Sequence, residues 1–316
     1  MFKRISDSAF DMDAPIPQDE SIWDYQYYSY DARAPNDTGR IELQVQDTSR
    51  YFLPAEAFIE VEGEILKTDT TEYDANTGAG FVNNGIMALL KGAAYMIDGR
   101  EIEICHDNID VATTILGLAR YSDDYTRSAG PSMMFAKDTS NSPEYQQYEV
   151  RRPRNFAKKA DADVQSMIIN VDPDFNLTFR SRRVMLKGNR RAFSCSIPLS
   201  HIFGFCRNVR KVIFGAKHTV VLVRKGTDDD AIWRPAGTDP GKVILTKLSL
   251  WMPTMTPSLT EEQHLLSFMD QGGKSTLSWL TMTTDAAQSA VNGLFTWQIA
   301  SQRDVSAPRH IFITFQ

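Results

Sequence analysis

The sequence has 316 residues, of which 42% are hydrophobic and 23% are charged, with a net charge of -6. This composition excludes an intrinsically disordered chain, and the length allows one large domain or two modest ones, each with its own core. The acidic balance argues against a protein coated uniformly in basic residues for nucleic acid.

The N-terminal stretch MFKRISDSAFDMDAPIP lacks the apolar run and the small-residue cleavage site of a signal peptide. Every apolar stretch also falls short of the roughly 18 residues that a membrane-spanning helix needs, so we expect no such segment. Cys105, Cys195 and Cys206 are odd in number and fit no C-x-x-C pattern. We expect reduced, mostly buried thiols in a protein that is assembled inside a cell.

Residues 1–39 show no periodicity and are predicted to form an extended N-terminal arm. Two interpretations stay open: a mobile tail, or an arm that becomes ordered against a neighbouring subunit. The second draws on closely spaced tyrosines, because such side chains suit interface contacts. The candidate interface tyrosines are Tyr25, Tyr27, Tyr28 and Tyr30.

Strand patterns begin at residue 40. The stretch RIELQVQ alternates apolar and polar residues, and FIEVEGEIL places Ile59, Val61 and Ile65 on one face with glutamates on the other. Such alternation is typical of half-buried strands in an antiparallel sheet. Further on, Asp98-Gly99 joins two short strands and predicts a type I′ hairpin turn, in which both central residues need a positive φ.

Two helices are predicted beside this hairpin, in VNNGIMALLKGA and in DNIDVATTILGLARY. Asparagine and aspartate are common N-caps, so the candidate caps are Asn83 or Asn84 for the first helix and Asp107 or Asn108 for the second. A long polar insertion follows at about 121–165. Irregular segments of that length are usually functional or mobile.

Strand patterns resume at SMIINV, NLTFRS, RAFSCSIPL, HTVVLVRK and KVILTKLSLWMP. Many short strands with few helices predict an all-β protein of the sandwich or jelly-roll type. The stretch SLTEEQHLLSFMD then predicts an amphipathic helix capped by Ser258 or Thr260. FTWQIA and HIFITFQ are predicted to be strands.

The sequence holds no recognisable catalytic or metal-binding pattern. DQGGKST at 270–276 is not a phosphate loop, because Phe268 stands where the motif needs glycine and a predicted helix precedes it. The five histidines have no metal-ligand spacing, and no nucleophile motif is present. We therefore expect a protein that is not an enzyme, with no catalytic residues, no cofactor and no metal.

Positive charge is concentrated between about residues 150 and 191. One interpretation is a solvated face or a contact with an acidic neighbouring subunit. The other is a salt-sensitive contact with the backbone of a packaged nucleic acid, without sequence recognition. The candidate contact residues are Arg151, Arg152, Arg154, Arg180, Arg182, Arg183, Arg190 and Arg191.

Two stretches of the chain resemble a known family. The segment from FVNNGIMALLKGAAYMIDGREIEICHDN to ILGLARYSDDY is similar to a part of the double jelly-roll major capsid proteins of Polintons, adintoviruses and virophages. The segment FSCSIPLSHIFGFCRNVRKVIFGAKHTVVLVRK, with GKVILTKLSLWMPTMTPS after it, resembles the stretch that closes the first jelly roll in those proteins.

The resemblance covers roughly residues 40–316 and implies a fold, partners and a location. We expect antiparallel β-sandwiches with short helices: a first jelly roll at 40–256, then a linker helix and the first strands of a second roll at 257–316. The implied protein forms homotrimeric, pseudo-hexameric capsomers of an icosahedral shell. Its implied partners are neighbouring capsomers, penton or minor capsid proteins and, non-specifically, the packaged genome, all within the virion.

The segment 257–316 supplies too few strands for a second roll, which needs about eight. The family continues beyond the part that resembles PRHIFITFQ, so we expect a second polypeptide, or the rest of a longer chain, to complete the roll. The candidate contact residues for it are Ile311, Phe312, Ile313 and Phe315. Alternative functions are a jelly-roll binding module, such as a lectin or a receptor-binding spike, and an enzyme on a β-sandwich.

Overall fold

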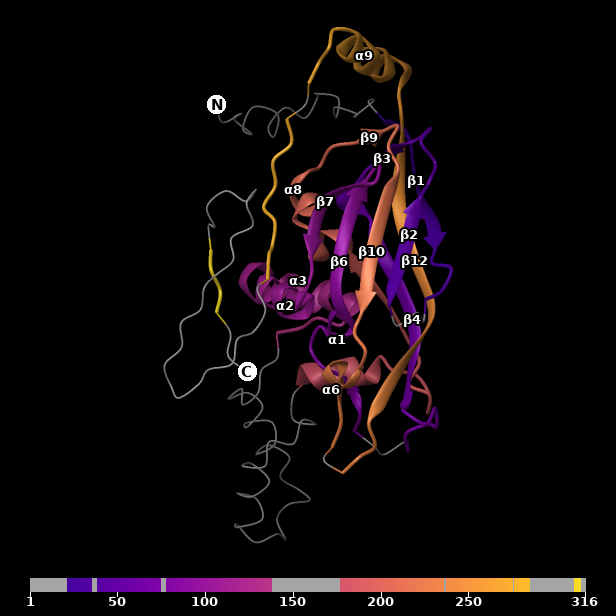
Figure 1. The fold of residues 1–316 in the computed structure, drawn as a ribbon, viewed down its shortest axis with the longest axis vertical. Coiled ribbons are helices and arrows are strands. Elements are labelled where there is room, and N and C mark those ends of the chain that lie inside the picture. The colour runs from indigo at the N-terminus through magenta and orange to yellow at the C-terminus, as the bar shows by residue number, and fades with distance from the viewer. Residues whose placement is uncertain are drawn as a thin grey trace, which may run out of the picture.

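The computed structural model describes residues 22–35, 39–74, 78–137, 177–235, 237–274, 276–284 and 310–313. Two antiparallel sheets, packed face to face, make up most of this part of the chain (Figure 1). The predicted all-β fold class with short helices is confirmed. Within the described residues the sheets form one β-sandwich, which we call the first roll.

The larger sheet, sheet A, has the strand order β8-β4-β12-β3-β9, with β1 also paired to β12. Its strands are β1 (Ile22–Asp31), β3 (Tyr51–Phe52), β4 (Phe58–Lys67), β8 (Phe193–Pro198), β9 (Ile213–Phe214) and β12 (Gly241–Pro257). The long strand β12 pairs with β4 through Gly241–Trp251 and with β1 through Ser249–Pro257, so it organises the sheet.

The smaller sheet, sheet B, has the order β2-β10-β6-β7. Its strands are β2 (Arg40–Val45), β6 (Leu90–Ile97), β7 (Arg100–Cys105) and β10 (His218–Arg224), and a separate pair joins β5 (Gly80–Phe81) to β11 (Ile232–Trp233). The predicted hairpin joins β6 to β7: Asp98 has φ 50° and Gly99 has φ 76°. Both angles are positive, as a type I′ turn requires, so this prediction is confirmed.

The strand patterns place the core between the sheets. In β4, Ile59, Val61 and Ile65 are buried while the glutamates between them are partly exposed, as the alternation predicted. Phe52, Tyr95 and Phe205 are among the large side chains that are fully buried. Burial of such side chains supplies roughly 25 cal/mol per Å² of apolar surface removed from water, so the intersheet core dominates the stability of the roll.

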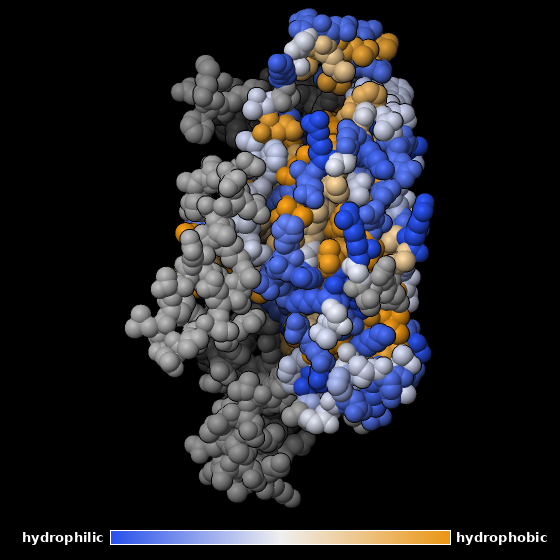
Figure 2. Space-filling view, viewed as in Figure 1, coloured by the Kyte–Doolittle hydropathy of each residue, from blue (hydrophilic) through white to orange (hydrophobic). Residues whose placement is uncertain are grey.

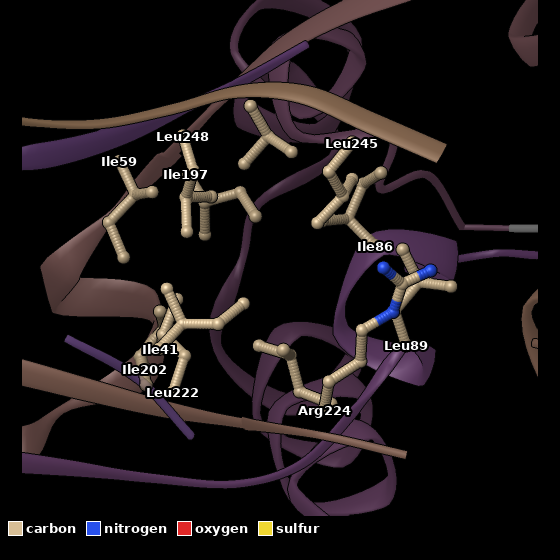
Figure 3. Close-up of a pocket in the computed structure, with 12 residues that line it drawn as sticks. Ile41, Ile59, Ile86, Leu89, Ile197, Ile202, Leu222, Arg224, Leu245 and Leu248 are labelled. Atoms are coloured by element: carbon tan, nitrogen blue, oxygen red, sulfur yellow. The ribbon is translucent and has the colours of Figure 1, made fainter. Parts of the chain in front are cut away.

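A small cavity of about 20 Å³ lies inside this core. Figure 3 shows that it is lined by branched aliphatic side chains from both sheets, with Ile59 and Leu248 on one side and Ile41 and Leu222 on the other. The volume is close to that of a single water molecule, and the lining is apolar, since Arg224 is its one charged residue and contributes its hydrocarbon stem. The cavity is therefore a packing defect rather than a ligand site.

Short helices connect the strands. They are η1 (Pro54–Glu56), α1 (Gly85–Ala88), α2 (Ile109–Arg120), α3 (Asp123–Ser128), η2 (Gly130–Met133), α6 (Leu177–Val184), α7 (Leu199–Ile202), α8 (Gly204–Asn208), η4 (Asp229–Ala231) and α9 (Leu259–Asp270). Ser258 caps α9, because its hydroxyl accepts a hydrogen bond from the backbone of Glu261 at 3.4 Å. This cap was one of the predicted alternatives.

The side-chain caps predicted for α1 and α2 are not formed, although asparagines do precede both helices. Asn84 and Asn108 do precede the two helices, but their φ angles are 57° and 52°, and neither side chain caps its helix. Instead Asn84 is buried and donates to the hydroxyls of Thr113 and Thr114 at 2.9 and 3.0 Å. It therefore joins α1 to α2.

Three further predictions are corrected by the structure. Part of the predicted N-terminal arm, Ile22–Asp31, forms strand β1, because β12 extends beyond β4 and leaves an edge to pair with. The stretch NLTFRS was predicted to be a strand, but its residues from Leu177 onward lie in helix α6. Residues 121–137, the start of the predicted insertion, form α3 and η2 and bury Met133 and Phe135. Residues 138–165 lie outside the described residues, as do the predicted strands SMIINV and FTWQIA.

Candidate assembly faces

The outward side of sheet A carries a cluster of aromatic rings, which we call the aromatic face: Tyr25, Tyr27, Phe58 and Trp251. The ring of Tyr25 meets that of Tyr27 edge-on at 5.5 Å between centroids, and Tyr27 lies 5.7 Å from Phe58. Phe58 stacks on Trp251 at 6.0 Å. The exposed fractions of Tyr25 and Tyr27 are 37% and 40%, so the cluster is open to a partner.

Hydrogen bonds hold these rings in place. The Tyr25 hydroxyl donates to Glu56 Oε2 at 2.6 Å, and the Trp251 indole N–H donates to Glu60 Oε2 at 2.9 Å. Burial and the Glu56 carboxylate raise the pKa of Tyr25, whereas the hydrogen bonds from Lys247 and Trp251 lower the pKa of Glu60. Rings fixed in this way lose little side-chain entropy when a partner covers them.

The other two predicted interface tyrosines lie apart from the aromatic face. Tyr28 is half-buried and lies under the guanidinium of Arg50, whose carbon is 3.9 Å from the ring centroid. Tyr30 packs against the hydrophobic core, and burial raises its pKa. The sequence thus found the tyrosines, but only Tyr25 and Tyr27 contribute to the aromatic face.

The arginines described by the structure serve the fold. Arg191 is buried and donates from Nη1 to the carbonyl of Ala79 at 2.7 Å and from Nη2 to that of Asp74 at 3.3 Å. Arg182 is buried too and donates to the carbonyl of Phe81 at 3.4 Å. Both therefore stabilise loops and are closed to an external anion. Burial is the main reason that the pKa of Arg191 is lowered.

Arg190 is exposed, but it forms an ion pair with Glu64 on sheet A at 2.6 Å. Arg183 is half-buried and lies near Gly78 and Gly80. Arg151, Arg152 and Arg154 lie outside the described residues, as does the side chain of Arg180. Arg182 and Arg191 are therefore held inside the fold and Arg190 pairs with Glu64 at its surface, whereas a contact of this segment with nucleic acid or an acidic neighbouring subunit stays a prediction.

The predicted C-terminal contact residues are partly described. Ile311, Phe312 and Ile313 have exposed fractions of 61%, 63% and 59%, and residues 310–313 contain no strand. A strand requires a hydrogen-bonded neighbour, and residues 310–313 pair with no strand of the described chain. The strand predicted there is thus not formed in these four residues, and Phe315 lies outside the described part.

Sequence reasoning missed a second face, on the opposite side of the view in Figure 1 from β1 and β12. There, residues 276–284 descend from α9 along α8 and β7. Trp279 meets Phe205 of α8 edge-on at 5.2 Å, and the backbone N–H of Leu280 donates to Asn208 Oδ1 at 3.2 Å. The only signal in the sequence was Trp279, in a short stretch without a clear helix or strand periodicity.

Apolar residues also gather at the end of the molecule that carries α9 (Figure 2). Leu259, Leu266 and Met269 have exposed fractions of 72%, 53% and 62%. An open groove of about 670 Å³ lies between this helix and the ends of β1, β3 and β12. The amphipathic helix predicted here thus exists, but it has no buried residue.

The described residues contain no group of three or more His, Cys, Asp or Glu side chains placed to hold a metal ion. His201 and His218 are buried and bond Tyr121 and Tyr95 through Nδ1 at 2.7 and 2.8 Å. The three cysteines are buried and free, as predicted, and burial raises the pKa of Cys195 to about 12. No helix in the described part of the chain is long and apolar enough to cross a membrane.

Comparison with known proteins supports the fold. Residues 174–316 match the family model of the double jelly roll-like domain. A search of curated proteins found no match. The double jelly-roll resemblance noted in the sequence is therefore confirmed for the C-terminal part of the chain.

Solved structures similar to this chain include that of the Sputnik virophage and two major capsid proteins. The Sputnik virophage structure is 10% identical over 82% of this chain, with a TM-score of 0.45. The Faustovirus major capsid protein is 8% identical over 81%, also with a TM-score of 0.45, and the mavirus major capsid protein is 8% identical over 81%, with a TM-score of 0.38. The chain covers 53%, 58% and 52% of these three, so it spans little more than half of their length.

Proposed function

We propose that the protein is a viral structural protein, a major capsid protein or part of one, that forms trimeric, pseudo-hexameric capsomers of an icosahedral shell. The observation that carries this proposal is the match of residues 174–316 to a double jelly roll-like domain, which includes β8, β10 and β12 of the first roll and extends beyond them. The role is structural rather than enzymatic, and its location is the virion.

The arrangement of the first roll supports assembly into a ring. Rings form from heterologous contacts, in which one surface of a subunit meets a different surface of the next. The first roll offers two unlike lateral surfaces, the aromatic face on sheet A and, on the other side, the surface formed by α8, β7 and the segment 276–284 that lies on them. In the proposed capsomer the aromatic face meets a neighbouring roll. Tyrosine and tryptophan suit that contact, because both are enriched where protein surfaces meet.

Negative-stain microscopy and native mass spectrometry of the purified full chain test the proposal. We expect particles with a hexagonal outline and a species with the mass of three protomers. Monomers that bind a glycan array would instead support the alternative of a jelly-roll binding module. The second polypeptide expected from the sequence stays a prediction, and the same mass spectrum tests it through a co-purifying chain of different mass.

The aromatic face can be tested with one substitution. Tyr27→Lys places a charge among the rings, and we expect the trimer population to fall at least about tenfold, since an unpaired charge is costly to bury in an interface. Gln46→Lys is the matched control, because Gln46 is exposed and lies next to β2 of sheet B. Equal trimer populations in the two variants would show that the aromatic face is not a subunit contact.

A further inference from the structure

The segment that leaves α9 has no regular secondary structure, yet it is attached to the first roll at several points. We call residues 279–284 the strap. It runs down the side of the roll from the α9 end toward α2, beside α8 and β7 (Figure 1). Trp279, Met282 and Thr284 are half-buried while the residues between them are exposed, so alternate parts of the strap face the roll.

A buried carboxylate lies at the centre of this contact. Glu103 projects from β7, is 5% exposed, and accepts hydrogen bonds from the backbone N–H groups of Gly204 at 2.9 Å and Phe205 at 2.8 Å. Burial raises the pKa of Glu103, and the backbone N–H of Met282 in the strap acts against this rise together with those of Phe205 and Gly204. A buried carboxylate is costly unless such donors surround it, so Glu103 favours the arrangement in which β7, α8 and the strap meet.

Independent contacts fix the strap above and below Glu103. On the α9 side are the Trp279–Phe205 ring contact and the hydrogen bond from Leu280 to Asn208. On the other side, the Thr284 hydroxyl donates to the carbonyl of Asp107, just after β7. Contacts on both sides of the carboxylate show that the whole of the strap is held, and not a single residue.

Gly204 makes the close approach of the strap possible. A Cβ atom built at this position would collide with the backbone carbonyl of Leu280. That backbone oxygen cannot move without moving the strap. The first residue of α8 therefore has no side chain at the point where the strap crosses it, which is what a surface shaped for a polypeptide backbone requires.

We propose that β7 and α8 form a docking groove for an extended polypeptide, that its occupant is the strap of the same chain, and that Glu103 is the clamp. The clamp fixes the path of the strap along the first roll as far as Thr284, beside the end of β7. Only the consequence for assembly rests on the proposed capsid function: a fixed strap limits how the second roll expected from the sequence can be placed relative to the first. The docking itself depends on the first roll alone.

Hydrogen exchange of the full chain, followed by mass spectrometry, tests the docking. We expect slow exchange of the strap amides in the wild type and at least about tenfold faster exchange in Gly204→Ala, because the added methyl group evicts the strap while the N–H that Glu103 binds is kept. Glu103→Gln also accelerates exchange. Glu101→Gln, an exposed acid two residues earlier on the same strand, is the matched control and leaves exchange unchanged.

Trp279→Ala provides a second route if a change in α8 or β7 impairs folding, because it alters only the strap. Faster exchange in 279–284, with the exchange of β6 and β10 unchanged, supports the docking groove. Fast exchange of the strap in the wild type, or unchanged exchange in both Gly204→Ala and Trp279→Ala, overturns it. Trimer formation is measured in a separate experiment. The absence of trimers would therefore contradict the proposed capsid function without changing the outcome of the exchange experiment.

Discussion

Two ion pairs of the first roll, one buried between the sheets and one on the surface, are expected to contribute very differently to stability. Between the sheets, Arg224 of β10 pairs with Asp228, and their side chains are only 4% and 8% exposed. On the outward side of sheet A, Arg190 pairs with Glu64, with exposures of 50% and 22%. A buried charge that loses its partner is strongly destabilising, whereas a surface pair contributes little.

The buried pair also joins the two sheets. Arg224 Nη2 donates to the carbonyl of Val243 in β12, and the N–H of Val243 donates to Asp228 Oδ2 at 2.8 Å. Arg224 at the end of β10 and Asp228 in the loop that follows are thus both bound to β12 of the other sheet. The outer pair does not join the two sheets, because the ion pair between Arg190 and Glu64 lies on the outward surface of sheet A.

The largest effect is expected at the buried pair. Arg224→Ala leaves the carboxylate of Asp228 without its cation inside the protein, and we expect the free energy of unfolding to fall by about 3–5 kcal/mol. Urea unfolding followed by tryptophan fluorescence measures it. Arg40→Ala removes an exposed partner of Glu42 and serves as the control. A loss of under about 1 kcal/mol at Arg224 would remove the distinction between the two regions.

The next largest effect concerns acid. Burial lowers the pKa of His201 to about 3 and that of His218 to about 4. The pKa of a histidine in the unfolded chain is near 6.5. Below that pH the unfolded chain binds protons at these two histidines while the folded chain does not, so the free energy of unfolding falls as pH decreases. At pH 5 we expect a loss of about 2 kcal/mol for each histidine relative to pH 7.5.

Unfolding midpoints between pH 4.5 and 7.5 measure this slope, and His218→Gln is expected to reduce it. The same midpoints at every pH would contradict the burial of both imidazoles. His218 suits the substitution, because its Nε2 is buried without a hydrogen-bond partner in the described structure. A glutamine therefore loses only one hydrogen bond, to Tyr95, together with the ring contact to Phe52.

A smaller effect is expected at Arg191. Arg191→Met removes the hydrogen bonds to the carbonyls of Ala79 and Asp74 and the guanidinium beside the Tyr73 ring, but keeps an apolar stem. Unsatisfied buried carbonyls cost about 1–3 kcal/mol, and we expect a loss in that range. Differential scanning calorimetry compares this variant with Arg190→Met, its chain neighbour.

The smallest effect is expected at the outer pair itself. Arg190→Ala should change the free energy of unfolding by about 0–1 kcal/mol, since the pair is half in solvent, and the change should vanish in about 1 M salt. Equilibrium unfolding at two salt concentrations checks it. If Arg190→Ala instead lowered the free energy of unfolding by about 3 kcal/mol or more, the outward charges of sheet A would be as important for stability as the buried pair.

The sequence predicted elements whose signal is local. The hairpin at Asp98-Gly99 was found because two adjacent residues need unusual φ angles, and β4 was found because its apolar residues alternate strictly. Strand β1 was missed because its tyrosines lie on both faces and hide the alternation. NLTFRS was misassigned because so short an apolar pattern fits a strand and a helix alike.

The candidate faces were only partly predictable, for a related reason. Glu103 belongs to REIEI, where alternation places its carboxylate outward like that of Glu101. Only the fold shows that α8 and the strap cover it. Likewise, the run of arginines predicted a positively charged segment. Whether a guanidinium faces solvent or a carbonyl depends on the fold, since Arg191 binds the carbonyls of Asp74 and Ala79, more than a hundred residues earlier in the chain.

The length of β12 has a mechanical consequence. Its 17 residues extend roughly 55 Å and carry antiparallel ladders to β4 and β1 along most of that length. A pull along this strand loads those hydrogen bonds in shear, so many must break together, whereas a pull across it would open them one after another. Because α9 begins directly after β12, tension from the C-terminal side of the chain enters the roll along its stiffest direction once the strap has been released.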